Sequence, residues 1–192
     1  MPRAKSPIYA VPFRRKREGR TIYGRRLALL QSRKPRLVVR KTGRGLVLQM
    51  VSFMPEGDRT IVAVNTKKLR EYGWVPKSNM PTAYLAGLLI GKLAKGKGIA
   101  SAVLDIGRHT PTKQSIVFAA MKGAMDAGVE SAMGMELDEN RLKGAHIAEY
   151  AKLIKGDKVR YERQFSQYIE AKVDPEKLME LFEKVKAKIM EG

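Results

Sequence analysis

The chain has 192 residues, of which 44% are apolar, and a formal net charge of +19 at pH 7. This length fits one domain with appendages, and the apolar content argues against a wholly disordered protein. The lack of cysteine excludes a disulfide framework and thiol catalysis, and no apolar run approaches the roughly 18 residues of a membrane span.

The positive charge is concentrated in the first quarter of the chain. Residues 1–50 carry 15 basic side chains and one acidic side chain, whereas residues 101–192 are close to neutral. A solvated charged face or a membrane surface would be the alternatives, but so much unbalanced charge favours a nucleic acid, and arginine pairs well with phosphate. The basic candidates for RNA contact are Arg3, Lys5, Arg14, Arg15, Lys16, Arg17, Arg20, Arg25, Arg26, Arg33, Lys34, Arg36, Arg40 and Arg44.

Three prolines predict an extended tail over residues 1–13, and a helix is predicted from about residue 15 to residue 31. Tyr23, Leu27 and Leu30 form its apolar stripe, so we expect this stripe on the body and the arginines outward. Tyr9, Phe13 and Tyr23 are interleaved with the arginines and are candidates for stacking on unpaired bases, ordinary packing being the alternative.

Strand patterns follow at residues 36–41, 46–54 and 60–64, joined by short turns, and they predict an antiparallel meander. A short helix is expected at 67–72 and a longer one at 82–93. The apolar run at 102–106 predicts a strand that is parallel to a neighbour, because a crossover helix precedes it.

The rest of the chain is predicted to be mainly helical. We expect a polar loop at 107–115, a helix at 116–127 capped by Ser115, and a helix at 140–154. Residues 158–171 are ambiguous, and Asp174 caps a last helix that begins with Pro175. The predicted class is therefore α/β, with a mixed sheet, a basic N-terminal tail and a C-terminal helical extension.

Enzyme chemistry finds little support in the sequence. Asp105 at a strand end would suit a ribonuclease-H-like nuclease, but two-metal chemistry needs several convergent carboxylates, and none lies in an obvious partner strand. His109 and His146 are the only histidines, and without cysteine or an HExxH spacing a zinc site is not expected. The start of the helix at Asn79 is either a cap or a phosphate site. We expect no catalytic residues, metal or cofactor.

Several segments, read together, resemble one family. They are YAVPFRRKREGRTIYGRRLALL (9–30), KPRLVVRK (34–41), GDRTIVAVNTKKLREYGW (57–74), NMPTAYLAGLLIGKLA (79–94), AVLDIG (102–107), PTKQSIVFAAMKGAMDAG (111–128) and KGAHIAEYAK (143–152). The chain resembles the universal 5S-rRNA-binding protein of the large ribosomal subunit, protein eighteen in bacteria and protein five in eukaryotes, and the archaeal form most of all. Gln114 departs from the glycine that relatives often carry there, and glutamine restricts the backbone more than glycine does.

The resemblance implies a ribonuclease-H-like α/β fold without its catalysis. It implies that the protein is a structural constituent of the ribosome that holds 5S rRNA and helps attach it to 23S rRNA in the central protuberance. The residues it points to are Arg14, Arg15, Lys16, Arg17, Arg20, Tyr23, Arg25, Arg26, Lys34, Arg36 and Arg40, together with Asn79, Thr82, Tyr84, Thr112, Lys113 and Ser115.

We predict three regions: an RNA-binding tail and helix (1–32), a mixed α/β core (33–130) and a helical extension packed on the core (131–192). The expected partners are 5S rRNA, 23S rRNA and neighbouring large-subunit ribosomal proteins, with no membrane and no small-molecule substrate. The expected location is the cytoplasm, on the ribosome. The alternatives are an RNA-binding or RNA-chaperone protein without 5S specificity, and a ribonuclease-H-like nuclease.

Overall fold

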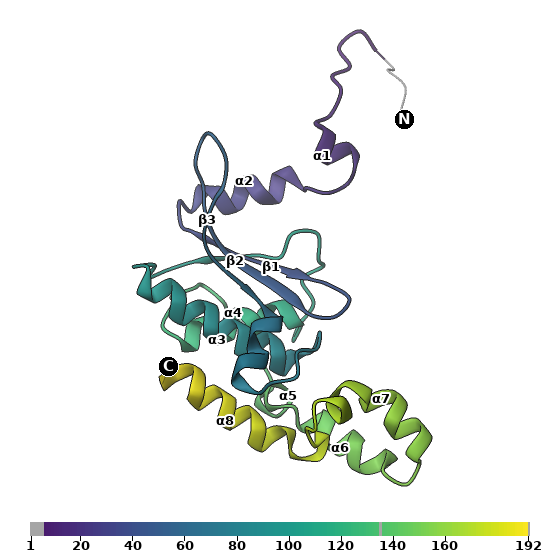
Figure 1. The fold of residues 1–192 in the computed structure, drawn as a ribbon. Helices are drawn as coiled ribbons and strands as arrows, with labels where there is room; N and C mark the ends of the chain where they lie inside the picture. Colours follow the sequence, from purple (N-terminus) through teal and green to yellow (C-terminus); the bar gives the residue numbers. More distant parts are fainter. Residues whose placement is uncertain (1–5, 135, 192) are drawn as a thin grey trace.

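A four-stranded mixed sheet lies at the centre of the protein (Figure 1). Its strands are β1 (Arg36–Lys41), β2 (Leu46–Ser52), β3 (Arg59–Asn65) and β4 (Val103–Asp105), in the order β3-β2-β1-β4. β1, β2 and β3 form an antiparallel meander, and β4 pairs with β1 in parallel. The structure, a computed structural model, describes residues 6–134 and 136–191. The predicted meander and parallel strand are both confirmed.

Alternation along the strands decides which side of the sheet is buried. In β1, Leu37 and Val39 are fully buried, whereas Val38 and Arg40 lie on the other face and are only partly covered. Because successive side chains point to opposite faces, one face of the sheet is apolar and packed while the other is mixed and more open.

The packed face of the sheet is covered by two helices, α3 (Met80–Gly96) and α4 (Ile116–Asp126) (Figure 1). α3 is buried around most of its circumference, as expected for a helix inside a core. The two helices approach backbone to backbone at Gly87 and Gly123: a Cβ atom on Gly87 would overlap the Ala120 carbonyl oxygen, and one on Gly123 the Tyr84 carbonyl oxygen. Only glycine permits so close an approach at these positions.

The remaining helical segments complete the body. They are the 3₁₀ helices η1 (Thr66–Tyr72) and η2 (Pro175–Lys177), and the helices α5 (Glu139–Lys143), α6 (Ala145–Ile154), α7 (Lys158–Glu170) and α8 (Leu178–Glu191). α8 lies against α3, where the Phe182 ring is 5.5 Å from that of Tyr84 and 6.2 Å from that of Trp74, centroid to centroid. Asp174 caps the start of η2 as predicted, by accepting a bond from the Glu176 N–H group.

Three local predictions were wrong. The helix expected at 15–31 is two helices, α1 (Arg14–Arg17) and α2 (Tyr23–Gln31), because Gly19 takes a positive φ of 63° between them. The helix expected at 140–154 is likewise broken at Gly144, whose φ is 88°. Ser115 stands at the N-cap position of α4, but its side chain makes no cap hydrogen bond.

Within the described ranges, no helix combines the length and the apolar character needed to cross a membrane. The division at residues 32 and 130 into three regions stays a prediction. Arg3 and Lys5 lie outside the described residues, so their predicted contacts have no counterpart in the structure.

Candidate nucleic-acid interface

A groove of about 1090 Å³ separates the N-terminal helices from the open face of the sheet. Helix α2 lies over this face, opposite α3 and α4 (Figure 1). Seven arginines line the groove, from α1, the turn between α1 and α2, α2, β1 and the loop that follows β4: Arg15, Arg20, Arg25, Arg26, Arg36, Arg40 and Arg108. The two acids among the lining residues are Asp58 and Asp105. The groove is therefore strongly cationic.

The way α2 sits on the sheet differs from the expectation. None of its residues is buried, and Leu27, which was predicted to pack on the body, is 62% exposed. Instead Arg25 donates to the carbonyl oxygens of Gly107 and His109 at 3.5 and 3.3 Å. The prediction that the apolar stripe packs inward while the arginines point outward is therefore wrong for these residues. Polar contacts, and little apolar burial, hold α2 in place.

A chain of ion pairs runs from α2 through the sheet. Arg26 donates two hydrogen bonds to Asp58, at 2.8 and 2.9 Å. Arg36 donates to Asp58 at 2.6 Å and to Asp105 at 2.9 Å, and Arg40 donates to Asp105 at 2.9 Å. Asp105 also accepts the Gly107 N–H at 2.8 Å. Both acids are therefore occupied by arginines of the protein itself.

These ion pairs divide the arginines predicted to contact RNA into two groups. The Arg36 side chain is only 3% exposed, so its guanidinium lies between two carboxylates and away from the surface. Arg26 and Arg40 are half-buried in the same chain of ion pairs. A salt bridge holds Arg14 and Arg20 to Glu18, but both remain well exposed, at 80% and 64% of their side-chain surface. Arg15, Lys16, Arg17, Arg33, Lys34 and Arg44 are exposed.

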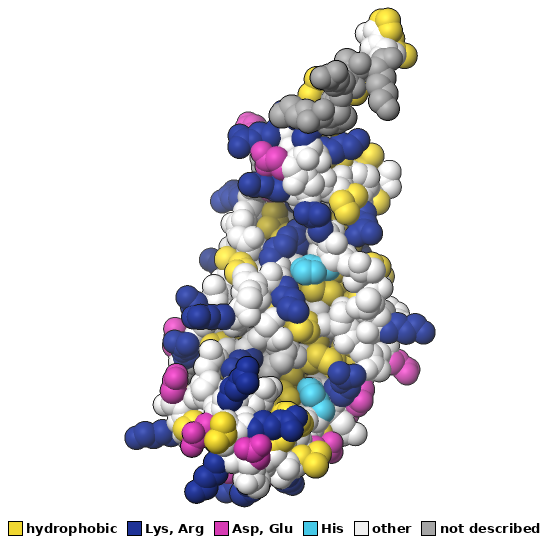
Figure 2. Space-filling view, turned by 90° about the vertical axis from the view of Figure 1, so that its right-hand side faces the viewer, with side chains coloured by type: hydrophobic (Ala, Val, Ile, Leu, Met, Phe, Trp, Pro, Cys, Tyr) yellow, Lys and Arg dark blue, Asp and Glu magenta, His cyan; other side chains and the backbone are white. Residues whose placement is uncertain are grey.

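An aromatic pair lies near the basic side chains. Phe13 and Tyr23, both exposed, stand with ring centroids 5.5 Å apart, and Tyr9 is partly buried. Phe13 before α1 and Tyr23 in α2 thus leave ring surface open to solvent, as base stacking requires. In Figure 2, Lys and Arg side chains lie close to one another on the part of the molecule next to the N-terminal tail.

The residues of the α3 start that the resemblance pointed to are mostly internal. Asn79 accepts the Thr82 N–H at 3.1 Å and so caps α3. The Thr82 side chain is buried and accepts the Trp74 indole N–H, and the Tyr84 hydroxyl donates to Asp126 at 2.7 Å. Burial, and then the hydrogen bond to Asp126, raises the pKa of Tyr84, so its ring stays neutral. Thr112 and Lys113 are exposed, and Ser115 is partly buried.

Asp58 joins α2 to the turn between β2 and β3, and its ionisation depends on that contact. Burial alone would raise its pKa, but the hydrogen bonds from Arg26 and Arg36 outweigh burial and hold the pKa below the ordinary value of 3.8. A carboxylate with a lowered folded pKa stabilises the fold above its unfolded pKa, and this contribution disappears as the pH falls through the folded pKa.

We therefore expect the melting temperature of Asp58→Asn to lie below that of the wild type at neutral pH, and the gap to close as the pH falls below 3.8 and through the lowered pKa of Asp58. The measurement is thermal unfolding by circular dichroism at several pH values. Glu56→Gln, an exposed acid in the same turn, is the matched control and should leave the melting temperature unchanged. A gap that stays constant with pH would mean that the Asp58 ion pairs do not form in solution.

The RNA contacts predicted from the sequence did not include Arg108 or His109, although both line the groove. A signal existed, because they lie in the loop that follows β4, and α/β proteins place function in such loops. The Arg108 guanidinium lies against the Gly19 turn between α1 and α2, 3.7 Å from where a Cβ atom on Gly19 would stand. This loop therefore forms the far wall of the groove.

The nuclease alternative would require further carboxylates close to Asp105. Across residues 6–134 and 136–191, no three His, Asp or Glu side chains cluster as a metal site requires. The two arginines that neutralise Asp105 also stand where a metal ion would have to bind. Asp105 therefore holds the sheet and its loop together.

The comparison with known families agrees with the fold. A family model described as "Ribosomal large subunit proteins 60S L5, and 50S L18" matches residues 8–98. This match includes the tail from residue 8, α1, α2, the antiparallel meander and α3, and thus one wall and the floor of the groove. Residues 8–98 of the chain are therefore similar to this family of large-subunit ribosomal proteins.

Proposed function

We propose that this protein binds 5S rRNA within the large ribosomal subunit and helps attach it to 23S rRNA. The observation that carries the proposal is the groove between α2 and the sheet, where seven arginines meet two acids that are already neutralised. RNA phosphates supply the missing negative charge, and arginine binds them with a planar pair of N–H donors.

The RNA contacts are expected to be mainly with phosphates and shape. The guanidinium groups that line the groove can pair with successive phosphates of an RNA backbone. The exposed Phe13–Tyr23 pair offers a stacking surface for an unpaired base. The exposed cations of α1 and of the turns extend the same surface beyond the groove. Arg36 contributes indirectly in this proposal, because it fixes Asp58 and Asp105 and so holds the two walls of the groove together.

The finer features of the proposal follow from the family resemblance. The protein is of the archaeal type, acts on the ribosome in the cytoplasm, has no catalytic role, and contacts neighbouring large-subunit proteins. A second candidate, an RNA-binding protein without 5S specificity, is favoured by the exposed charge alone, because phosphate contacts carry no sequence information.

The test of the proposal is a filter-binding titration of labelled 5S rRNA at about 0.2 M salt with excess tRNA, since non-specific electrostatic binding weakens steeply with salt. Saturable binding that survives the tRNA is the expected result. If excess tRNA abolishes the binding, the result supports an RNA-binding protein without 5S specificity and contradicts the proposal.

The double variant Arg15→Ala, Arg108→Ala removes one cation from each wall of the groove. We expect weaker 5S rRNA binding and a salt dependence whose slope falls by about 0.7–0.9 for each phosphate that the protein no longer neutralises. The measurement is the binding constant at a series of salt concentrations. The double variant Lys152→Ala, Arg160→Ala removes the same charge from exposed sites on α6 and α7 and is the control. Equal slopes in the two double variants would show that the groove is not part of the RNA-binding interface.

A further inference from the structure

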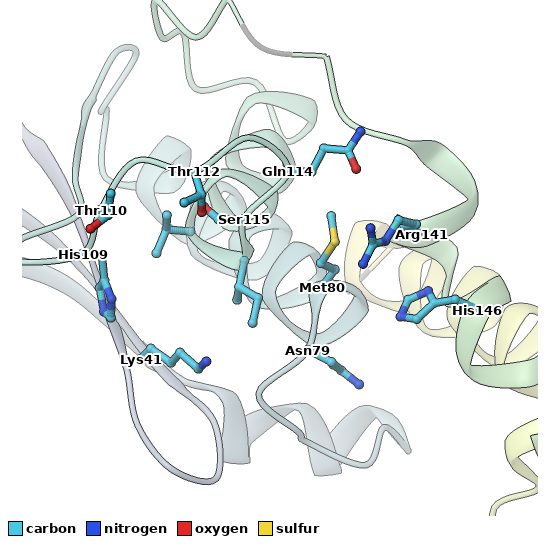
Figure 3. A pocket seen from close by; sticks show the side chains of 12 residues that line it. Lys41, Asn79, Met80, His109, Thr110, Thr112, Gln114, Ser115, Arg141 and His146 are labelled. Carbon is cyan, nitrogen blue, oxygen red and sulfur yellow. The ribbon is translucent and has the colours of Figure 1, made fainter. Parts of the chain in front are cut away.

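A second pocket, of about 440 Å³, lies beside the groove where the starts of α3 and α4 meet the end of β1. It is lined by Lys41 from β1, Asn79 at the start of α3, His109 from the loop after β4, Ser115 before α4, and Arg141 and His146 from α5 and α6. Figure 3 shows Lys41 and His109 on one side of the pocket and Arg141 and His146 on the other, with Ser115 between them. No sequence pattern pointed to Lys41 or Arg141.

The charge of this pocket is one-sided. Two of its lining side chains are basic, a lysine and an arginine, two are imidazoles, and none is acidic. Within the described part of the chain, neither Lys41 nor Arg141 has a carboxylate within ion-pair distance. The positive charge of the pocket is therefore available to an anion from solution.

Hydrogen-bond donors without a partner face the same pocket. The Ser115 hydroxyl is buried and has no hydrogen-bond partner, although it stands where a cap would be. The N–H groups of Phe118 and Ala119 bond to the Ser115 carbonyl oxygen. Those of Ile116 and Val117, which line the pocket, donate no hydrogen bond to any described residue. The start of an eleven-residue helix thus offers free donors and its positive dipole end.

The conformation of Gln114 turns the chain into this arrangement. Gln114 has a φ of 55°, in the left-handed region that glycine adopts without strain. This explains why a glycine suits the position, and why glutamine there is held by its surroundings rather than by its own preference. The turn directs Ser115 and the start of α4 at the cationic side chains.

We propose that this pocket binds a phosphate group, and that in the assembled particle the phosphate belongs to the RNA backbone. His109 lines both the groove and the pocket, so a strand that leaves the groove passes directly to the second site. The choice of RNA as the source of the phosphate rests on the proposed function. The contact would bring α5 and α6 of the C-terminal extension into RNA binding.

The His146 ring offers an NMR signal that reports whether an anion occupies the pocket. Partial burial, and after it the neighbouring Arg141, lowers the pKa of His146, while Asp138 and Glu149 oppose the shift. A bound phosphate would favour the charged imidazole and raise this pKa. The ring resonances of His146 therefore report an anion in the pocket independently of any RNA measurement.

The first arm of the experiment titrates the full chain with inorganic phosphate, at constant ionic strength set with chloride, and follows the Ile116 and Val117 amides and the His146 ring by NMR. Saturable shifts are expected in the wild type and in Arg160→Ala, which removes an exposed cation outside the pocket. Arg141→Ala and Lys41→Ala should each weaken the binding about tenfold or more. Absence of saturable shifts in the wild type would overturn the pocket as a phosphate site.

The second arm measures 5S rRNA binding against salt for Arg141→Ala and Arg160→Ala. A slope lower by about 0.7–0.9 in Arg141→Ala alone is the expected result when one phosphate is no longer neutralised. Equal slopes, with phosphate binding intact in the first arm, would overturn RNA as the source and leave the free phosphate ion as the ligand. Failure of the wild type to bind 5S rRNA would overturn the proposed function, while the first arm would still decide the pocket.

Discussion

Replacing Asp105 with alanine is expected to lower the free energy of unfolding by about 3–5 kcal/mol, because it leaves a buried arginine without its partner. Arg36 is 3% exposed and would keep only Asp58, and Arg40 and the Gly107 N–H would lose their acceptor. For a chain of this length the melting temperature should fall by about 10 °C. The measurement is urea unfolding followed by circular dichroism, together with thermal unfolding.

The matched control for Asp105 is Glu176→Ala, which breaks the ion pair of Glu176 with the exposed Lys155. A solvent-exposed lysine contributes little to stability through such a pair, because solvent screens the charge. A loss of similar size in both variants would show that the ion-pair chain through Arg36 does not stabilise the sheet. An Asp105→Asn protein that kept its stability but lost a metal-dependent RNA-cleaving activity would instead favour the nuclease alternative.

The second large effect is expected at the contact between α3 and α4. Gly123→Ala places a methyl group on the Tyr84 carbonyl, and Gly87→Ala places one on the Ala120 carbonyl. Backbone atoms cannot turn aside as a flexible side chain can, so the two helices must separate. Overpacking a well-packed core costs about 1–3 kcal/mol and occasionally more. Because both clashes are with backbone atoms, we expect a loss near the upper end of this range, about 3 kcal/mol, for either variant.

Gly96→Ala is the control for this contact, because it lies in the same helix α3 and nothing stands within 4 Å of the added Cβ atom. Alanine there should leave the protein as stable or raise the stability by about 0.5–1 kcal/mol through helix propensity. Chemical unfolding of the three variants side by side tests the difference. A Gly123→Ala protein as stable as Gly96→Ala would contradict the close packing of the two helices.

In helix α2, the amphipathic pattern predicted the helix but not the face that it turns to the sheet. The spacing of Tyr23, Leu27 and Leu30 indicated a helix, and a helix forms over Tyr23–Gln31. The pattern could not decide which face meets the body, because the sheet face beneath α2 is itself half polar, with Arg40 and Gln49 on it. Arg26 therefore pairs with Asp58, and Tyr23 and Leu27 remain exposed, whereas Leu30 is partly buried.

The arginines show the same limit. Composition indicated a polyanion partner, because the net charge of a segment can be read from its sequence without knowledge of the fold. Which arginines are free depends on pairs far apart in the chain, such as Arg36 with Asp105, which are 69 residues apart. The phosphate pocket is likewise assembled from Lys41, Ser115 and Arg141, which no local motif joins.

By itself, the sequence determined the class of the fold, the antiparallel meander with its parallel fourth strand, and the basic character of the N-terminal quarter. These features follow from periodicity, turn residues and charge, which act over a few neighbouring residues. Tertiary structure alone decided the orientation of α2, the burial of Arg36 and the convergence of donors at Ser115. Each of these depends on ion pairs and helix starts that only the folded chain brings within a few ångströms of one another.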